Sequence, residues 1–195
     1  DPHLRFALLG DFADAKQERL PQDAIVEAEA KRKIEALNEK YAGPGETIFY
    51  YLQRRRLWNE CENAWMGWER KRGKLVEFVE LLRGRRDTTF RTVVGDESVF
   101  PRIRYVITLD ADTLLPLESA RQMIAAIHFP YNRPRLNAQG TRVSEGYGVL
   151  QPRIATSYKG ATVTRLTELL SGAPGIDPYA FAVSDPYQDS VGEGI

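Results

Sequence analysis

The sequence predicts an α/β fold with a mostly parallel sheet flanked by helices, and three observations support this prediction. Short apolar runs alternate along the chain with longer segments of helical periodicity, as in sheets whose parallel strands are joined by helices. The 195 residues are 43% hydrophobic and 28% charged, which is ordinary for one globular domain. Acidic residues follow two of the apolar runs, at the sheet edge where α/β folds bind ligands.

Composition argues against several classes of protein. The net charge is zero, so no overall field draws the chain to nucleic acid or to an anionic membrane. The sequence has no apolar run of transmembrane length, and its first residues lack the pattern of a signal peptide. Cys61 is the only cysteine, and the histidines are His3 and His128. A disulfide, a cysteine-rich zinc site and a histidine-based catalytic centre are therefore not expected, and a reducing compartment is.

The first half of the chain is expected to contain two strands and two helices. Residues 4–9 read as a strand that ends at Asp11, and residues 47–52 read as a second strand. Pro21 opens a helix that continues to about residue 40. A second helix is expected between Gly73 and Gly84, because apolar residues there recur at helical spacing.

A basic region lies between these elements. Residues 53–86 carry 10 Lys and Arg against 5 Asp and Glu. Lys71, Arg72 and Lys74 fall at the amino end of the expected second helix, where cations oppose the helix dipole unless an anion such as a diphosphate is bound. The alternative is a solvated charged face. The three tryptophans in the same region are compatible with stacking on nucleic acid, with sugar binding or with core packing.

The stretch on which the functional interpretation depends is residues 105–112. Residues 105–109 are β-branched, aromatic or aliphatic and read as a buried strand, and Asp110 and Asp112 come directly after it. Two carboxylates one residue apart at a strand end can share Mg²⁺ or Mn²⁺, or one can hold the metal and the other a sugar hydroxyl. The alternative is an ordinary solvated Asp turn.

The remaining elements complete the alternating pattern. A short strand is expected at residues 90–94, and a helix from Pro116 onward. Residues 130–140 read as loop and residues 147–151 as a strand. A last helix is expected at residues 162–170, followed by loop from Ser171.

Five segments in this order resemble a known family. They are residues 8–15, 65–75, 106–113, 145–153 and 174–179. The string Trp-Met-Gly-Trp-Glu-Arg-Lys-Arg-Gly-Lys-Leu at 65–75 is the most specific of them. Together they are similar to the glycosyltransferase domain of the cyclic β-1,2-glucan synthases, the family-84 glycosyltransferases. The resemblance covers nearly the whole chain.

The resemblance implies a GT-A type fold, UDP-glucose as donor, a β-1,2-glucan acceptor and a divalent cation, Mg²⁺ or Mn²⁺. Asp110 would face the ribose and the metal, and Asp112 would ligate the metal. Asp11 would meet the nucleotide, and Lys74 would lie near the diphosphate. Gln151 and Arg153 would line the cleft for donor and acceptor.

The resemblance also implies that residues 1–195 form a single, partial domain of a multi-pass membrane protein. That domain would lie at the cytoplasmic face of the bacterial inner membrane, beside the remainder of the synthase. The resemblance further implies that the given sequence starts at the second strand of a GT-A domain and not at the first. The family's general base would lie beyond Ile195, so the catalytic base is unknown and the isolated chain is expected to be inactive.

Two rival functions stay open on sequence alone. A strand followed by Asp-x-Asp-x-Thr also fits haloacid-dehalogenase-type phosphatases, with Asp110 as nucleophile and Asp112 as acid. That family needs a later lysine, for which Lys159 is the one candidate after Asp112, and a later acidic pair. The second rival is a non-catalytic fragment that binds a nucleotide sugar.

Overall fold

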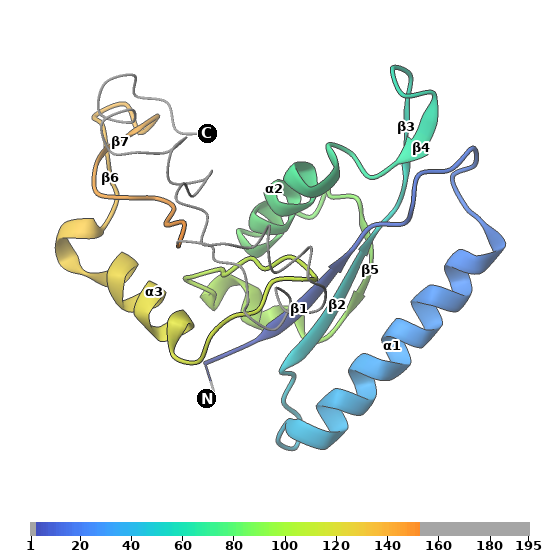
Figure 1. The fold of residues 1–195 in the computed structure, drawn as a ribbon, viewed down its shortest axis with the longest axis horizontal. Helices are drawn as coiled ribbons and strands as arrows, with labels where there is room; N and C mark the ends of the chain where they lie inside the picture. Colours follow the sequence, from blue (N-terminus) through green and yellow to red (C-terminus); the bar gives the residue numbers. More distant parts are fainter. Residues whose placement is uncertain (1–2, 153–195) are drawn as a thin grey trace, which may run out of the picture. The chain divides into compact units, whose positions relative to one another are not determined.

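The computed structural model describes residues 3–152, which fall into two compact units that meet at residue 106. In the first unit the elements are β1 (Phe6–Gly10), α1 (Pro21–Tyr41), β2 (Phe49–Arg54), β3 (Leu57–Asn59), β4 (Ala64–Met66), α2 (Arg70–Leu82), β5 (Phe90–Val94) and the 3-10 helix η1 (Glu97–Arg102) (Figure 1). In the described part of the second unit they are α3 (Ser119–His128), η2 (Pro130–Asn132), β6 (Arg135–Leu136) and β7 (Val143–Glu145).

The main sheet has the strand order β1-β2-β5. β1 is parallel to β2, and β5 is antiparallel to it. The described sheet is therefore mixed, and the expectation of a mostly parallel sheet is wrong for this part of the chain. The physical reason lies at Thr89, just before β5. Its N–H donates to Glu77 of α2 and its carbonyl accepts from Arg55, so β5 has to start beside the end of β2.

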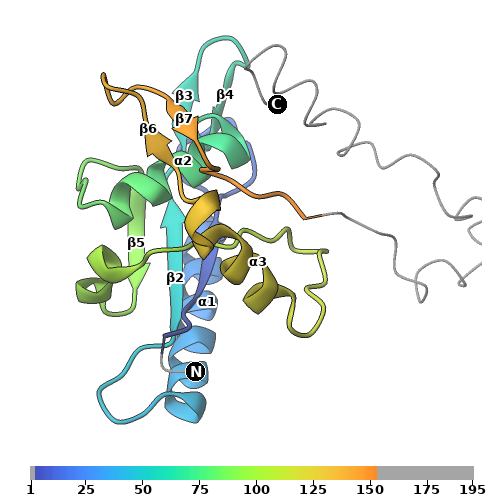
Figure 2. The same ribbon diagram turned by 90° about the vertical axis from the view of Figure 1, so that its left-hand side faces the viewer.

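Two helices cover opposite faces of this sheet (Figures 1 and 2). Tyr50 and Leu52 point to the α2 side and form the core with Phe78, Leu81, Leu82 and Phe100. Side chains alternate along a strand, so Tyr51 points to the α1 side. Burial there raises the pKa of Tyr51 to about 12. The mixed α/β architecture that the sequence predicts is confirmed at this level.

Helix α1 matches its predicted range closely. Pro21 occupies the first turn, where its missing N–H costs nothing, and Asp23 accepts from the backbone N–H of Leu20 at 2.8 Å. The apolar residues that recur at helical spacing along α1 are only partly buried, however. Ile34 is 7% exposed, whereas Ile25 is 71% exposed. The helix therefore meets the sheet along one side, and near its end Asn38 and Tyr41 still contact Phe49 of β2.

The predicted buried strand at residues 105–109 is wrong. No strand is assigned there, and Tyr105, Val106 and Leu109 are between 36% and 50% exposed. β-branched and aromatic residues favour a strand only where a neighbouring strand and a packed face exist, and nothing in residues 3–152 pairs with this stretch. β1 likewise has β2 as its one strand neighbour in the described sheet, and its Phe6 and Leu8 side chains are about half exposed.

The second unit departs from prediction at its strands. Its helix α3 begins at Ser119, three residues after the predicted start, and β6 and β7 form a short antiparallel hairpin. The strand predicted at residues 147–151 is absent from the described structure, which has β7 earlier in the chain. The helix at 162–170 and the loop from Ser171 lie outside the described residues. None of the described helices is long and apolar enough to cross a membrane.

Candidate functional site

Charged side chains gather where β1 and β2 end. The last parallel pair of the two strands is Gly10 with Gln53, so Asp11 and Arg54 follow at one edge of the sheet. Glu77 and Lys74 reach the same place from α2. We call Asp11, Arg54, Lys74 and Glu77 the strand-end cluster. It occupies the edge at which α/β proteins bind ligands.

Arg54 is the centre of the strand-end cluster. Its Nε and Nη2 donate to the two carboxylate oxygens of Asp11 at 2.7 and 3.2 Å. Its Nη1 donates to Glu77 at 3.1 Å and to the carbonyl of Trp68 at 3.0 Å, and Nη2 also donates to the carbonyl of Arg70 at 2.9 Å. A guanidinium has five N–H donors. All five are used inside the protein and the side chain is fully buried, so Arg54 is a structural residue.

The two carbonyl contacts hold an unusual turn ahead of α2. Glu69 and Arg70 have φ values of 50° and 49°, in the left-handed region that costs a non-glycine residue of order 1–3 kcal/mol. Gly67 lies close beside them: a Cβ there would stand 2.8 Å from Nη2 of Arg54 and 2.9 Å from Cγ of Asp11. The Trp-Met-Gly-Trp segment is thus shaped to pass over the Arg54–Asp11 pair.

Lys74 differs from Arg54 because it keeps donors to offer. Its Nζ lies 3.2 Å from Oδ2 of Asp11, and its side chain is 19% exposed. α2 begins at Arg70 and not after Gly73, so Lys74 is in the second turn and not at the amino end, as the sequence had suggested. An ammonium has three donors, and Asp11 is its one ion partner among residues 3–152. Lys74 is therefore suited to bind an anion at this edge.

A second buried arginine fixes the loop after β1. Arg56 donates to the Asp23 carboxylate at 2.6 and 3.1 Å and to the carbonyls of Ala13 and Glu18 at 2.7 and 3.0 Å. Its Cζ also lies 4.8 Å from the ring centre of Phe12. The hydrogen bond from Arg56 lowers the pKa of Asp23 against the opposing effect of burial.

Sequence reasoning did not predict which of the three arginines at residues 54–56 are buried and which is exposed. Arg54 and Arg56 are buried and paired, whereas Arg55 between them is exposed. The signal was present, because three arginines at a strand end alternate between faces. Which face is buried depends on the positions of α1 and α2, and the sequence alone does not give those.

Trp58 and Trp65 belong to a separate hairpin, and Trp68 follows it in the chain. β3 and β4 pair Trp58 with Trp65, and their ring centres are 5.9 Å apart. Ala15 exchanges two backbone hydrogen bonds with Trp65, at 2.9 and 2.8 Å, which ties the loop after β1 to the hairpin. Trp58 and Trp68 are 45% and 46% exposed. Core packing is therefore wrong for these two rings, and stacking on a sugar or a base stays a prediction.

The other candidate residues lie in the second unit. Asp110 and Asp112 are both exposed, on a turn in which the N–H of Thr113 donates to the carbonyl of Asp110 at 3.0 Å. Within residues 3–152, no three or more Asp, Glu, His or Cys side chains are grouped as metal ligands would be. Gln151 is exposed, and Arg153 lies outside the described residues. Of the six site residues, the structure brings together Asp11 and Lys74.

Comparison with known proteins identifies a relative. The sequence is 47% identical over 192 residues to the cyclic beta-(1,2)-glucan synthase NdvB of Rhizobium meliloti (strain 1021). The match covers 98% of this chain and 7% of the length of that relative. No protein-family model matches the sequence. The chain is therefore homologous to one segment of that synthase.

Proposed function

We propose that this chain is part of the glucosyltransferase domain of a cyclic β-1,2-glucan synthase. In this proposal the domain has a GT-A type fold and transfers glucose from UDP-glucose to a growing β-1,2-glucan chain. The homology to a segment of the Rhizobium meliloti synthase supports the parent enzyme. The motifs at residues 65–75 and 106–113 support the glycosyltransferase domain within it.

The strand-end cluster is the observation that carries the proposal. Arg54 pairs with both Asp11 and Glu77 and holds the chain in place, and Lys74 is the second cation in the cluster with these two carboxylates. Asp11 positions the Lys74 ammonium at this edge of the sheet, and the ammonium keeps further N–H donors for a ligand. A partly buried ammonium binds a diphosphate more strongly than one in open water, because screening is weaker there. We assign Lys74 to the diphosphate of the donor and Asp11 to the nucleotide side of the same site.

Asp110 and Asp112 would hold the divalent cation. Two exposed carboxylates one residue apart provide the hard oxygen ligands that Mg²⁺ and Mn²⁺ prefer, and they leave other positions for diphosphate oxygens and water. When bound, the ion would offset the charge of the departing UDP. Gln151 and Arg153 would line the cleft, in keeping with the family motif.

The proposal also covers the acceptor, the partner and the cellular location of the domain. The acceptor is the β-1,2-glucan chain, the partner is the remainder of the synthase, and the location is the cytoplasmic face of the bacterial inner membrane. The catalytic base is not assigned to any residue of this chain.

Calorimetric titration of the chain with UDP-glucose, with and without Mn²⁺, tests the proposal. We expect binding that depends on the metal in the wild-type chain and is abolished by Asp112→Asn, with an unchanged circular dichroism spectrum. Unchanged affinity in Asp112→Asn would contradict the metal assignment. The absence of UDP-glucose binding in a folded sample would contradict the donor site itself.

A turnover assay tests whether the isolated chain supplies a catalytic base. We expect it to bind UDP-glucose without transferring or releasing glucose, because no base is assigned to this chain. Measurable glucose transfer to a β-1,2-glucan acceptor would show that the catalytic base lies within these 195 residues, contrary to our assignment.

A further inference from the structure

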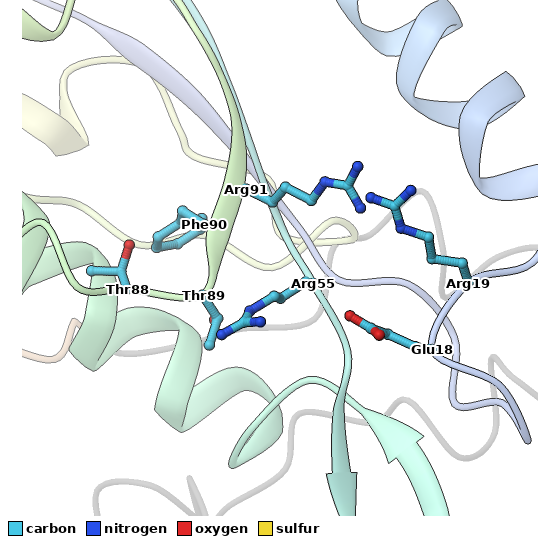
Figure 3. A pocket seen from close by; sticks show the side chains of 7 residues that line it. All are labelled: Glu18, Arg19, Arg55, Thr88, Thr89, Phe90 and Arg91. Carbon is cyan, nitrogen blue, oxygen red and sulfur yellow. The ribbon is translucent and has the colours of Figure 1, made fainter.

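A hollow of about 400 Å³ lies where the loop before α1 meets the start of β5 (Figure 3). Its walls come from three segments of the first unit: Glu18 and Arg19 before α1, Arg55 after β2, and residues 88–91 at the start of β5. The volume falls in the range of small-molecule sites, about 300–1,000 Å³. None of the four residues of the strand-end cluster lines the hollow, although Thr89, which does line it, donates its N–H to Glu77 of the cluster.

Three arginines dominate the hollow. Figure 3 shows the side chains of Arg19 and Arg91 extending toward each other, and the guanidinium of Arg55 beside Thr89. All three arginines are exposed, and none has a salt bridge or a side-chain hydrogen bond to another residue in the described range 3–152. Like charges in one concave site raise its potential and attract an anion.

The fold positions each of these arginines by a separate device. The carbonyl of Glu18 accepts from Arg56, which fixes the segment that carries Arg19. The N–H of Arg55 donates to the carbonyl of Thr89 at 2.9 Å, which joins two walls of the hollow. These contacts fix the backbone that carries Arg19 and Arg55 and leave their guanidinium groups available to a ligand.

Arg91 is placed by an irregularity of the sheet. Gln53 pairs with Thr92 and Arg54 pairs with Phe90, so Arg91 is an extra residue of β5 with no partner in β2. Such bulges re-aim a side chain and are frequent beside binding sites. Without the bulge, side chains would alternate strictly between the two faces of the sheet from Thr92 to Phe90. The extra side chain of Arg91 would then not be added to this wall of the hollow.

We propose that Arg19, Arg55 and Arg91 form a binding site for the phosphoryl group of a small molecule, distinct from the donor site. Planar guanidinium forks match phosphate oxygens in pairs, and three of them suit a group with more than one negative charge. Glu18 and Thr88 line the same hollow and can accept from or donate to ligand hydroxyls. The ligand class is therefore a phosphorylated, hydroxyl-bearing compound.

Another hollow of the first unit shows that this charge pattern is not general. It has a volume of about 660 Å³ and is lined by Glu35, Glu39 and Glu46, with no Lys or Arg among its lining residues. A concave site on this protein is thus not cationic by default.

Pyrophosphate titration in the Lys74→Ala background tests the proposal, because that background removes the cation assigned to the donor diphosphate. We expect pyrophosphate to bind, and Arg55→Gln or Arg91→Gln to weaken its binding at least about tenfold. Arg72→Gln is the matched control, since Arg72 is an exposed arginine of α2 paired with Glu69. It should change the affinity by less than about twofold.

Two results would overturn this site: no pyrophosphate binding in the Lys74→Ala background, or equal losses in Arg55→Gln and Arg72→Gln. Acetate addresses the ligand class. It should bind at least about tenfold more weakly than pyrophosphate, and equal affinities would contradict phosphoryl recognition. Neither outcome depends on whether UDP-glucose binds at the strand-end cluster.

Discussion

The strand-end cluster and the Asp110–Asp112 turn look equally functional in sequence but differ in structure. In the cluster, Asp11 has two cationic partners within 3.2 Å and Arg54 has no donor left over. In the turn, both carboxylates are exposed on a stretch that is not in a strand. The first region is organised by contacts among its own side chains, whereas the second is an exposed turn in which the N–H of Thr113 donates to the carbonyl of Asp110.

The difference teaches that charge at a strand end serves two purposes. Buried arginines that are fully hydrogen-bonded hold the fold, and the residues beside them with donors to spare are the ones to examine for binding. Both kinds occur within residues 54–56, where Arg54 and Arg56 are buried and Arg55 is exposed. Both also occur within the strand-end cluster, where Arg54 is fully paired and Lys74 has donors to spare. Substitutions at matched positions measure how sharp this separation is.

Arg54→Ala should give the largest loss of stability. It leaves the Asp11 and Glu77 carboxylates without their shared partner and frees the strained turn at Glu69. Removal of one member of a buried ion pair costs about 3–5 kcal/mol. Arg55→Ala, one residue away and exposed, should cost less than about 0.5 kcal/mol. Urea denaturation followed by circular dichroism gives both values. Similar losses in the two variants would break the comparison.

Gly73→Ala should destabilise the chain by about 1–3 kcal/mol, although alanine is the better helix former. Gly73 is buried in α2, and a Cβ there would stand 2.1 Å from the carbonyl oxygen of Trp68. That oxygen accepts from Arg54, so relief of the clash would disturb the cluster. The control is Gly84→Ala, which is strained by its φ of 98° but has open space around it. A more stable Gly73→Ala variant in urea would show that the turn is not closely packed.

Asp23→Asn should remove part of the acid sensitivity of the fold. The hydrogen bond from Arg56 holds the pKa of Asp23 below its ordinary value. Unfolded Asp23 therefore takes up a proton at a higher pH than folded Asp23 does. The stabilisation is full above the ordinary Asp pKa and is lost as pH falls through the folded value.

The measurement is the free energy of unfolding between about pH 6 and pH 3. The wild-type chain should lose stability more steeply than Asp23→Asn over the acid end of this range. Parallel curves for the two proteins would show that Asp23 does not contribute to the pH dependence.

Asp112→Asn should give the smallest change in stability, within about 0.5 kcal/mol. The side chain is exposed, in contrast to the carboxylates of the strand-end cluster. The same urea titration measures it. A loss of more than about 2 kcal/mol would mean that the turn is organised by its own contacts after all, and would blur the distinction between the two regions.

Local signals predicted much of the first unit. Pro21 and the periodicity that follows it located α1, and the β-branched run at residues 90–94 located β5 within its observed bounds. Asp11 and Lys74 were both named from sequence, and the structure joins them. What failed was non-local. The direction of β5 depends on Glu77 holding Thr89, and the strand expected at residues 105–109 requires a neighbouring strand that residues 3–152 do not supply.

The central claim is that Lys74 binds the diphosphate of a nucleotide donor. The most direct test is calorimetric titration of uridine and UDP into the wild-type chain and Lys74→Ala. We predict that the wild-type chain binds UDP more tightly than uridine. Lys74→Ala should weaken UDP binding by about 1–3 kcal/mol, the range for loss of a charged hydrogen bond, and leave uridine binding unchanged. Equal wild-type affinities for UDP and uridine, or an unaltered UDP affinity in Lys74→Ala, would contradict the claim.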